Sequence, residues 1–310
     1  MKIVLLDALT LGDSDLSRFD SLGVFTSYET TDENQRLAHI GDNEVIITNK
    51  VVIDEAIMIA NPQLKLICIS ATGTNNVDLV AAEKAGIRVK NVSGYSTESV
   101  AQSTFAMLFQ LLHQQRYYDQ YTGDKSWCSS PTFTHIERGF SELAGKRWGI
   151  IGYGAIGQRV AEIAKVFGCE LCYFSTSGKN SGQSIEQVDL DSLLTDCDII
   201  SIHAPLNEKT ENLIASDELQ KLKTGAIILN LGRGGIIDEA AMAKALDIQD
   251  IYHGTDVLAI EPMVEDHSYF SIQEKHRLVV TPHTAWASSE ARATLINKVI
   301  DNIKSLYQSV

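Results

Sequence analysis

The sequence predicts an α/β protein built from two doubly wound parallel sheets. Short apolar runs alternate with helical segments over the first hundred residues, and the same alternation resumes after Arg147. Runs that are apolar throughout are typical of parallel strands buried on both faces. The third observation is a glycine-rich turn, Gly152–Gly157, between a short apolar run and a helical pattern. The 310 residues, 44% of them hydrophobic, are enough for about two domains.

Five strands are predicted in the first half, at residues 2–6, 23–28, 44–48, 66–70 and 88–91. Helices are expected between them, for example over residues 53–60 and 77–85. A long apolar helix over residues 99–114 is expected to carry the chain into the second domain. The polar and aromatic stretch 117–141 is interpreted as a long surface connection that packs on a partner subunit.

Six strands are predicted in the second half, at residues 149–151, 170–174, 199–202, 226–230, 251–256 and 278–281. An amphipathic helix over residues 287–307 then returns to the first domain. The expected division is therefore residues 1–98 plus 287–310 as one domain, and residues 99–286 as the other.

Composition excludes several classes of partner. A formal net charge of -14 repels nucleic acid and anionic membrane surfaces. The chain has no apolar run of about 18 residues, so no membrane span is expected. Its first residues are expected to form a strand and not a signal peptide. Five scattered cysteines predict reduced thiols and a cytoplasmic setting. Cys169 and Cys172 are interpreted as packing residues, and no metal site is expected.

The glycine turn predicts nucleotide binding because it joins a strand to a helix. Gly152 permits the tight turn, Gly154 lets the backbone approach a pyrophosphate, and Gly157 lets the helix pack closely on the strand. The helix N-terminus at Ala155 and Ile156 then offers N–H groups and a positive dipole end to the phosphates.

Three candidate catalytic residues follow predicted strands, namely Arg233, Glu261 and His283. Ligands of open α/β sheets bind at the carboxyl ends of the strands. His203 also ends a predicted strand and is expected to line the cofactor site, whereas His267 lacks such placement and is interpreted as a surface or packing residue.

The chemistry of the three residues fits reduction of a 2-keto acid by hydride from a nicotinamide. A guanidinium at Arg233 suits a carboxylate and polarises the adjacent carbonyl. An imidazole at His283 passes the proton, and a carboxylate at Glu261 orients the ring and favours its protonated form. In the reverse direction, neutral His283 is the base that oxidises a 2-hydroxy acid.

Together these residues resemble the D-isomer-specific 2-hydroxyacid dehydrogenase family over nearly the whole chain. Besides the glycine turn and the three catalytic segments, the resemblance rests on residues 72–78 (TGTNNVD) and 91–101 (NVSGYSTESVA). It implies two Rossmann-like domains with the active site in the cleft between them, usually in a homodimer. Residues 1–98 plus 287–310 are then the substrate-binding, flavodoxin-like domain, and residues 99–286 the dinucleotide-binding domain. It also implies that backbone N–H groups at Thr72 and Gly73 hold the substrate carboxylate, and that Asp256 meets the nicotinamide amide.

Further site residues are expected on the same basis. Tyr95 and Trp286 are expected at the substrate, and the cofactor contacts are expected to include Pro205, Leu231, Gly232, Thr284 and Ala285. The ending 283–287 (HTAWA) resembles the glycerate dehydrogenases, or hydroxypyruvate reductases.

Several alternatives stay open. Glyoxylate and pyruvate are other substrates of the family. Formate enzymes pair their histidine with a glutamine, so Glu261 counts against that activity. A nicotinamide-sensing interaction protein, similar to the C-terminal-binding-protein corepressors, is the alternative from another class.

The cofactor prediction is NAD, with NADP possible. The family often has an acid at the end of the second strand to bind the adenosine ribose, whereas this chain has Ser175. A carboxylate there repels a 2′-phosphate, but a serine does not, and Lys179 is able to attract one. Serine also hydrogen-bonds a ribose hydroxyl, which keeps NAD the favoured cofactor.

Overall fold

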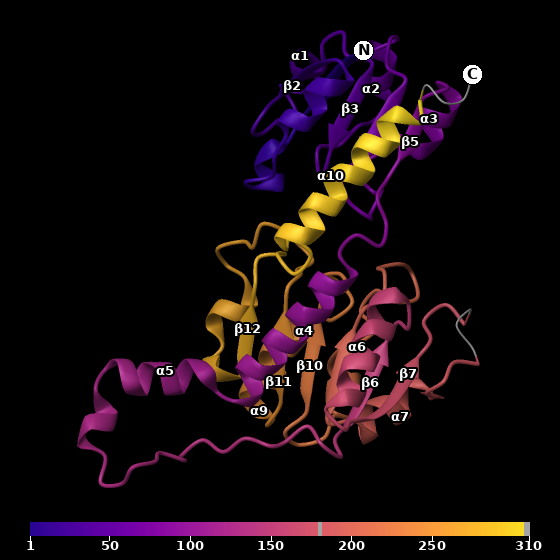
Figure 1. The fold of residues 1–310 in the computed structure, drawn as a ribbon. Helices are drawn as coiled ribbons and strands as arrows, with labels where there is room; N and C mark the ends of the chain where they lie inside the picture. The colour runs from indigo at the N-terminus through magenta and orange to yellow at the C-terminus, as the bar shows by residue number, and fades with distance from the viewer. Residues whose placement is uncertain (179–181, 307–310) are drawn as a thin grey trace. The chain divides into compact units, whose positions relative to one another are not determined.

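The computed structural model describes residues 1–178 and 182–306, and Lys179 and the end of the chain lie outside them. The chain forms two compact units (Figure 1). The first unit comprises Met1–Ser96 and the chain from Ala287 onward, and the second unit is Thr97–Trp286. The boundaries expected from the sequence were 98/99 and 286/287.

In the described residues, the first unit has a five-stranded parallel sheet. Its order is β2 (Val24–Ser27), β1 (Lys2–Leu5), β3 (Val45–Thr48), β4 (Leu66–Ile69) and β5 (Arg88–Lys90). The α-helices that accompany this sheet are α1 (Arg36–Ile40), α2 (Glu55–Ala60), α3 (Leu79–Lys84) and α10 (Ser289–Lys304). Asp54 and Asp78 cap α2 and α3, because their carboxylates accept the N–H groups of Ile57 and Ala81.

In the part that the structure describes, the second unit has a seven-stranded parallel sheet. The order is β12 (Leu278–Val280), β11 (Tyr252–Thr255), β10 (Ile227–Asn230), β9 (Ile199–Ile202), β6 (Arg147–Ile151), β7 (Glu170–Phe174) and β8 (Glu186–Gln187). Its α-helices are α4 (Thr97–Leu112), α5 (Gln115–Gly123), α6 (Ala155–Val166), α7 (Leu190–Asp196), α8 (Ser216–Leu219) and α9 (Glu239–Ile248). The two doubly wound parallel sheets predicted from the sequence are thereby confirmed.

Short 3-10 helices join some of these elements. They are η1 (Ala8–Leu11), η2 (Ser17–Leu22), η3 (Ser126–Ser129), η4 (Ser268–Ser271) and η5 (Lys275–Arg277). No helix in the described ranges is both long enough and apolar enough to cross a membrane.

Apolar side chains cover both faces of the second sheet, because its strands are buried between helix layers. Trp148 is fully buried, and its indole N–H donates to the Ser201 hydroxyl at 2.9 Å. Cys172 belongs to one of the two clusters and Cys169 to the other, in keeping with their interpretation as packing residues. The sheet therefore gives the site loops at its edge a rigid support.

The sequence prediction was wrong in two places in this unit. Helix α5 occupies the start of the stretch interpreted as a surface connection, and the short strand β8 was not predicted. Both are solvent-facing: no residue of α5 is buried, and both residues of β8 are exposed. Neither therefore contains the aliphatic residues on whose periodicity the prediction depended.

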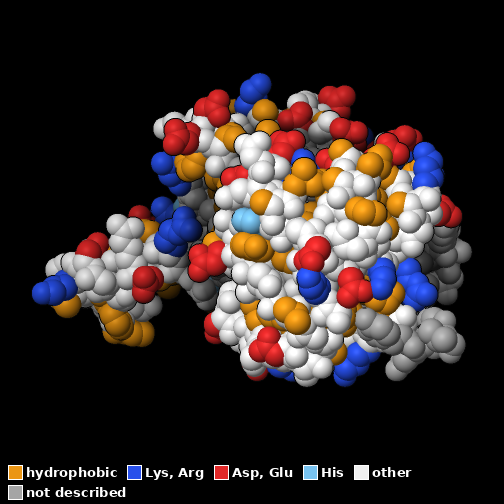
Figure 2. Space-filling view, turned by 90° about the horizontal axis from the view of Figure 1, so that it is seen from above, with side chains coloured by type: hydrophobic (Ala, Val, Ile, Leu, Met, Phe, Trp, Pro, Cys, Tyr) orange, Lys and Arg blue, Asp and Glu red, His pale blue; other side chains and the backbone are white. Residues whose placement is uncertain are grey.

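Residues 115–142, named here the arm, project from the second unit (Figures 1 and 2). Stacked rings stiffen it, since the centroids of Tyr121 and His135 are 3.9 Å apart. The Tyr117 hydroxyl lies 2.7 Å from Nε2 of His135. Large apolar side chains nevertheless face solvent on the arm, with Phe133 89% and Ile136 79% exposed. Large apolar side chains exposed on one projecting segment are typical of a protein interaction surface.

Candidate active site

The glycine turn after β6 has the geometry that a phosphate site requires. Gly152 has φ +90°, and a Cβ there would lie 2.7 Å from the backbone nitrogen of Ala204. A Cβ on Gly157 would lie 2.4 Å from the Gly152 carbonyl oxygen. By contrast, no described atom lies within 4 Å of a Cβ built on Gly154. The outer glycines are therefore needed for packing, whereas the middle one leaves its surroundings open for a ligand.

Helix α6 begins directly after this turn, at Ala155 and Ile156. Among the described residues, no side chain caps its first turn. The N-terminus thus keeps both its dipole and its donors available for an anion. The residues fit the pyrophosphate of a dinucleotide.

His203 lies beside the same turn, at the end of β9. The residue keeps some exposure, yet both ring nitrogens are buried and have no hydrogen-bond partner in the described part of the chain. Burial lowers the pKa of His203 to about 3, so the ring is neutral at physiological pH. Buried polar atoms without partners are uncommon in native proteins, and they fit a site that a ligand completes.

The arginine loop follows β10. The side chain of Asn230, itself buried, accepts the N–H of Gly232 at 3.1 Å and donates to the Arg233 carbonyl at 2.9 Å. The exposed Arg233 guanidinium donates to the Gly232 carbonyl at 2.7 Å. The loop backbone is thus held by a buried amide, while the guanidinium reaches solvent.

Glu261 and His283 are in direct contact, although 22 residues separate them. Nδ1 of His283 lies 2.7 Å from Oε2 of Glu261, and the other carboxylate oxygen accepts the Leu258 N–H at 3.0 Å. A carboxylate only accepts, so the Nδ1 nitrogen carries the proton. The ring is therefore oriented with Nε2 on the side away from Glu261.

Asp256 holds the loop that carries His283. Its buried carboxylate accepts the Thr281 hydroxyl at 2.5 Å and the backbone N–H groups of Thr284 and Ala285 at 2.9 Å each. Burial raises the pKa of Asp256, and these donors oppose that rise. Inside this clamp His283 has φ +53°, a left-handed conformation that is uncommon for a side chain of this size. Such strained backbone at a candidate catalytic residue is typical of active sites.

The arginine and glutamate loops pack against each other. A Cβ on Gly234 would lie 1.9 Å from the Leu258 carbonyl carbon and 2.3 Å from the Ala259 nitrogen. The residue after Arg233 therefore touches the backbone that leads to Glu261. The structure thus places these two loops side by side and pairs Glu261 with His283.

The remaining expected cofactor residues of this unit also follow its strands. Leu231 and Gly232 are buried next to Arg233, and Pro205 is exposed two residues after His203. The Ser175 hydroxyl accepts the Gly178 N–H at 3.1 Å, which leaves its own O–H as a donor. Lys179, expected to attract a 2′-phosphate, lies outside the described residues.

Trp286 is partly buried at the end of the second unit and packs against its core. The other expected substrate residues belong to the first unit. Thr72 follows β4; its hydroxyl donates to the Val92 carbonyl at 3.0 Å, and the Asn91 amide donates to its carbonyl at 2.7 Å. These bonds fix the loop of Thr72 and Gly73, and Tyr95 lies half-buried beyond it.

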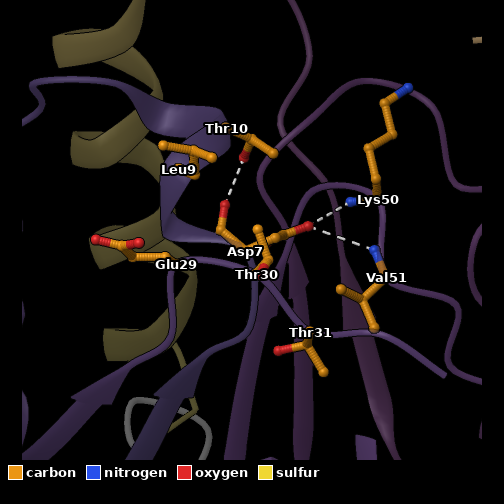
Figure 3. Close-up of a pocket in the computed structure, with 8 residues that line it drawn as sticks. All are labelled: Asp7, Leu9, Thr10, Glu29, Thr30, Thr31, Lys50 and Val51. Atoms are coloured by element: carbon orange, nitrogen blue, oxygen red, sulfur yellow. Dashed lines mark hydrogen bonds between the residues drawn. The ribbon is translucent and has the colours of Figure 1, made fainter. Parts of the chain in front are cut away.

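Sequence reasoning missed an open pocket of about 330 Å³ at the carboxyl ends of β1 and β3, which polar and apolar side chains line together (Figure 3). Asp7 lines it and is 5% exposed. The Asp7 carboxylate accepts the N–H groups of Asn49 at 2.9 Å and Lys50 at 2.7 Å. An acid directly after a strand was the available signal. The partners are 42 and 43 residues away along the chain, so the sequence did not reveal them.

Comparison with known proteins agrees with this geometry. The family model described as "D-isomer specific 2-hydroxyacid dehydrogenase, NAD binding domain" matches residues 105–285. A hydroxypyruvate reductase of Blautia hydrogenotrophica is 33% identical, covering 99% of this chain and 97% of the relative. A glycerate dehydrogenase of Methylorubrum extorquens is 34% identical, covering 98% and 95%.

Among solved structures, an acyclic imino acid reductase in complex with NADPH and D-Arg superposes with a TM-score of 0.85. It is 29% identical, and the match covers 98% of this chain and 96% of that one. The chain therefore belongs to the D-isomer-specific 2-hydroxyacid dehydrogenases, enzymes that act on the CH–OH group of their donors with a nicotinamide cofactor.

Proposed function

We propose that this enzyme interconverts a small D-2-hydroxy acid and its 2-keto acid, with hydroxypyruvate and glyoxylate as the favoured keto acids. The observation that carries the proposal is the hydrogen-bonded pair of Glu261 and His283, next to the arginine loop. The names of the relatives in Blautia and Methylorubrum support the choice of hydroxypyruvate and glycerate. D-Lactate and pyruvate are the alternative substrates within the family.

In the reductive direction, the Arg233 guanidinium binds the substrate and polarises its C2 carbonyl. A bound nicotinamide supplies the hydride that C2 receives. Nε2 of His283 protonates the carbonyl oxygen as its charge develops, and the ring returns to the neutral form. Glu261 accepts from Nδ1 and stabilises the imidazolium before that transfer. In oxidation the same neutral ring accepts the hydroxyl proton.

The proposed cofactor contacts all involve residues of the second unit. We assign the pyrophosphate to Gly154 and the N-terminus of α6, where the backbone is open. The neutral ring of His203 supplies unpaired nitrogens at the same edge. Asp256 binds the nicotinamide amide through the remaining lone pairs of its carboxylate, in addition to holding the His283 loop. Thr284 and Ala285 belong to that loop and contact the cofactor through their backbone.

NAD is the proposed cofactor, and NADP is the alternative. Ser175 has no charge to repel a 2′-phosphate, and its hydroxyl is able to donate to a ribose oxygen. The imino acid reductase of similar fold was solved with NADPH, which supports keeping the alternative.

The substrate carboxylate is assigned to the backbone N–H groups of Thr72 and Gly73, whose loop is held by Asn91. Tyr95 and Trp286 are the proposed determinants of side-chain size. The proposed assembly is a homodimer formed through the arm, because large apolar side chains such as Phe133 are exposed there. We also propose a reducing, cytoplasmic setting. The five cysteines are free thiols, and the sulfurs of Cys172 and Cys197, 3.5 Å apart, share a hydrogen bond and not a disulfide.

A kinetic panel tests the proposal. NADH and NADPH oxidation is followed with hydroxypyruvate, glyoxylate and pyruvate at matched concentrations. The highest kcat/KM is expected with hydroxypyruvate or glyoxylate and with NADH. If no keto acid is turned over although the cofactor binds tightly, the enzyme proposal is wrong and a nicotinamide sensor is supported.

A further inference from the structure

We propose that Glu239 and His267 are positioning residues: a buried pair that fixes the Leu258–Glu261 loop and, through Glu261, the orientation of His283. This inference rests on the function proposed above. Neither residue was expected in the site, and His267 was interpreted as a surface or packing residue. In the structure, the side chains of Glu239 and His267 are only 16% and 7% exposed.

The pair joins three segments of the second unit. Glu239 is the first residue of α9, and its Oε2 lies 2.8 Å from Nε2 of His267, which precedes η4. Its Oε1 accepts the backbone N–H of Ala259 at 2.7 Å. Both carboxylate oxygens are thus engaged, one by the imidazole and one by the glutamate loop.

The direction of each hydrogen bond is determined by the partners. The Tyr269 N–H donates to Nδ1 of His267 at 3.2 Å, so Nδ1 carries no proton. The proton of the neutral ring is therefore on Nε2 and is donated to Glu239. A chain of bonds runs from Tyr269 through His267 and Glu239 to Ala259.

The next residues connect this chain to the catalytic pair. Leu258 precedes Ala259, and its N–H donates to Oε1 of Glu261 at 3.0 Å. The second oxygen of Glu261 holds Nδ1 of His283 at 2.7 Å. A shift of Ala259 therefore moves the donor that orients Glu261, and with it the imidazole that transfers the proton. Groups behind an active site act in this way when they lock the residues that touch the substrate.

Helix capping does not account for the pair. Asp238 already caps α9, since its side chain accepts the Ala241 N–H at 2.9 Å. A glutamate in the first turn is favourable at the helix dipole on its own, without a buried histidine. The hydrogen bonds of Glu239 to His267 and to Ala259 are explained by the need to hold the Leu258–Glu261 loop.

The test begins with Glu239→Gln. A glutamine still accepts the Ala259 N–H, but its amide group then faces the Nε2–H of His267, so two donors meet. We expect kcat for keto acid reduction to fall about tenfold, with little change in the Kd of NADH. The pH at which the reductive rate declines should move to lower values, because a displaced Glu261 stabilises the imidazolium of His283 less strongly. Loss of stability alone would not move that pH.

Glu218→Gln is the matched control. Glu218 is also in the first turn of a helix, α8, and also accepts a backbone N–H, from Ala215 at 3.1 Å. Among the described residues, no series of hydrogen bonds links it to the site. This variant should keep the wild-type kcat and pH profile. The double variant Glu239→Gln/His267→Gln restores an acceptor opposite the new amide, so its kcat should exceed that of Glu239→Gln alone.

Hydrogen exchange gives a readout that does not depend on turnover. In Glu239→Gln, the amides of Leu258 and Ala259 should lose protection at least about tenfold relative to amides in β10. If wild type turns over no keto acid but this protection is lost, the function proposed above fails while the positioning role stands. Unchanged exchange at both amides, or an unchanged pH profile with kcat within twofold of wild type, overturns the inference.

Discussion

The contact between the arginine and glutamate loops leads to a sharp prediction at Gly234. In Gly234→Ala the new Cβ would lie 1.9 Å from the Leu258 carbonyl carbon, whereas ordinary contact begins at 3.4 Å. The two loops must therefore separate by at least 1.5 Å (3.4 minus 1.9). The nearest atoms are backbone, so no side-chain rotation relieves the clash. A 1 Å misplacement of catalytic groups costs about 100-fold in rate, or roughly 2.7 kcal/mol of barrier.

We therefore expect kcat/KM for the best keto acid to fall about 100-fold in Gly234→Ala, with the Kd of NADH nearly unchanged. Overpacking should also lower the free energy of unfolding by about 1–3 kcal/mol, so the assay is run well below the melting temperature. Gly139→Ala is the control, because no described atom lies within 4 Å of a Cβ at that position. A kcat/KM in Gly234→Ala within about threefold of that control would refute the claim that contact between these loops sets the site geometry.

Further predictions concern pH and cofactor choice. Glu261→Gln should move the decline of the reductive rate with rising pH to lower pH by about one unit, because an amide does not stabilise the imidazolium; an unmoved pH–rate profile contradicts this. Ser175→Asp should raise the KM for NADPH at least about tenfold through repulsion of the 2′-phosphate but leave that for NADH nearly constant; equal effects on both would place Ser175 away from the ribose. Burial lowers the pKa of His253 to about 4 in the folded protein, against about 6.5 in the unfolded chain. The unfolded state thus binds the extra proton between these values, and stability falls as pH drops through this window. In His253→Gln, the free energy of unfolding, measured by urea denaturation, should fall less steeply with decreasing pH than in the wild type, by about 1 kcal/mol per pH unit. An identical slope would show that His253 is not buried in its neutral form.

The parts of the fold that the sequence predicted are those with a strong apolar pattern. Strand β4, for example, is buried at every residue, so its apolar run is uninterrupted. Helix α5 faces mostly solvent, so its residues are polar or aromatic and offer none of the aliphatic periodicity on which the helix predictions depended. Strand β8 has two residues at a sheet edge, too few for any period to be recognised.

In the candidate site too, some residues were predictable from the sequence and others were not. Arg233, Glu261 and His283 were predictable because each follows a strand of a parallel sheet, where loops converge. Glu239 and His267 were not, because their contact joins residues 28 apart through the packing of α9 on η4. Asp256 was assigned to the cofactor by resemblance alone. Its bonds to Thr284 and Ala285 became visible only in the structure.

The central claim is that Arg233 and His283 carry out keto acid reduction on a rigid, cofactor-binding unit. It is tested most directly by kcat/KM of Arg233→Ala with the best keto acid, measured beside the Kd of NADH. We predict a folded variant that binds NADH as wild type does and has lost nearly all turnover. A loss of less than about tenfold, equivalent to roughly 1.4 kcal/mol, would show that the guanidinium does not bind and polarise the substrate.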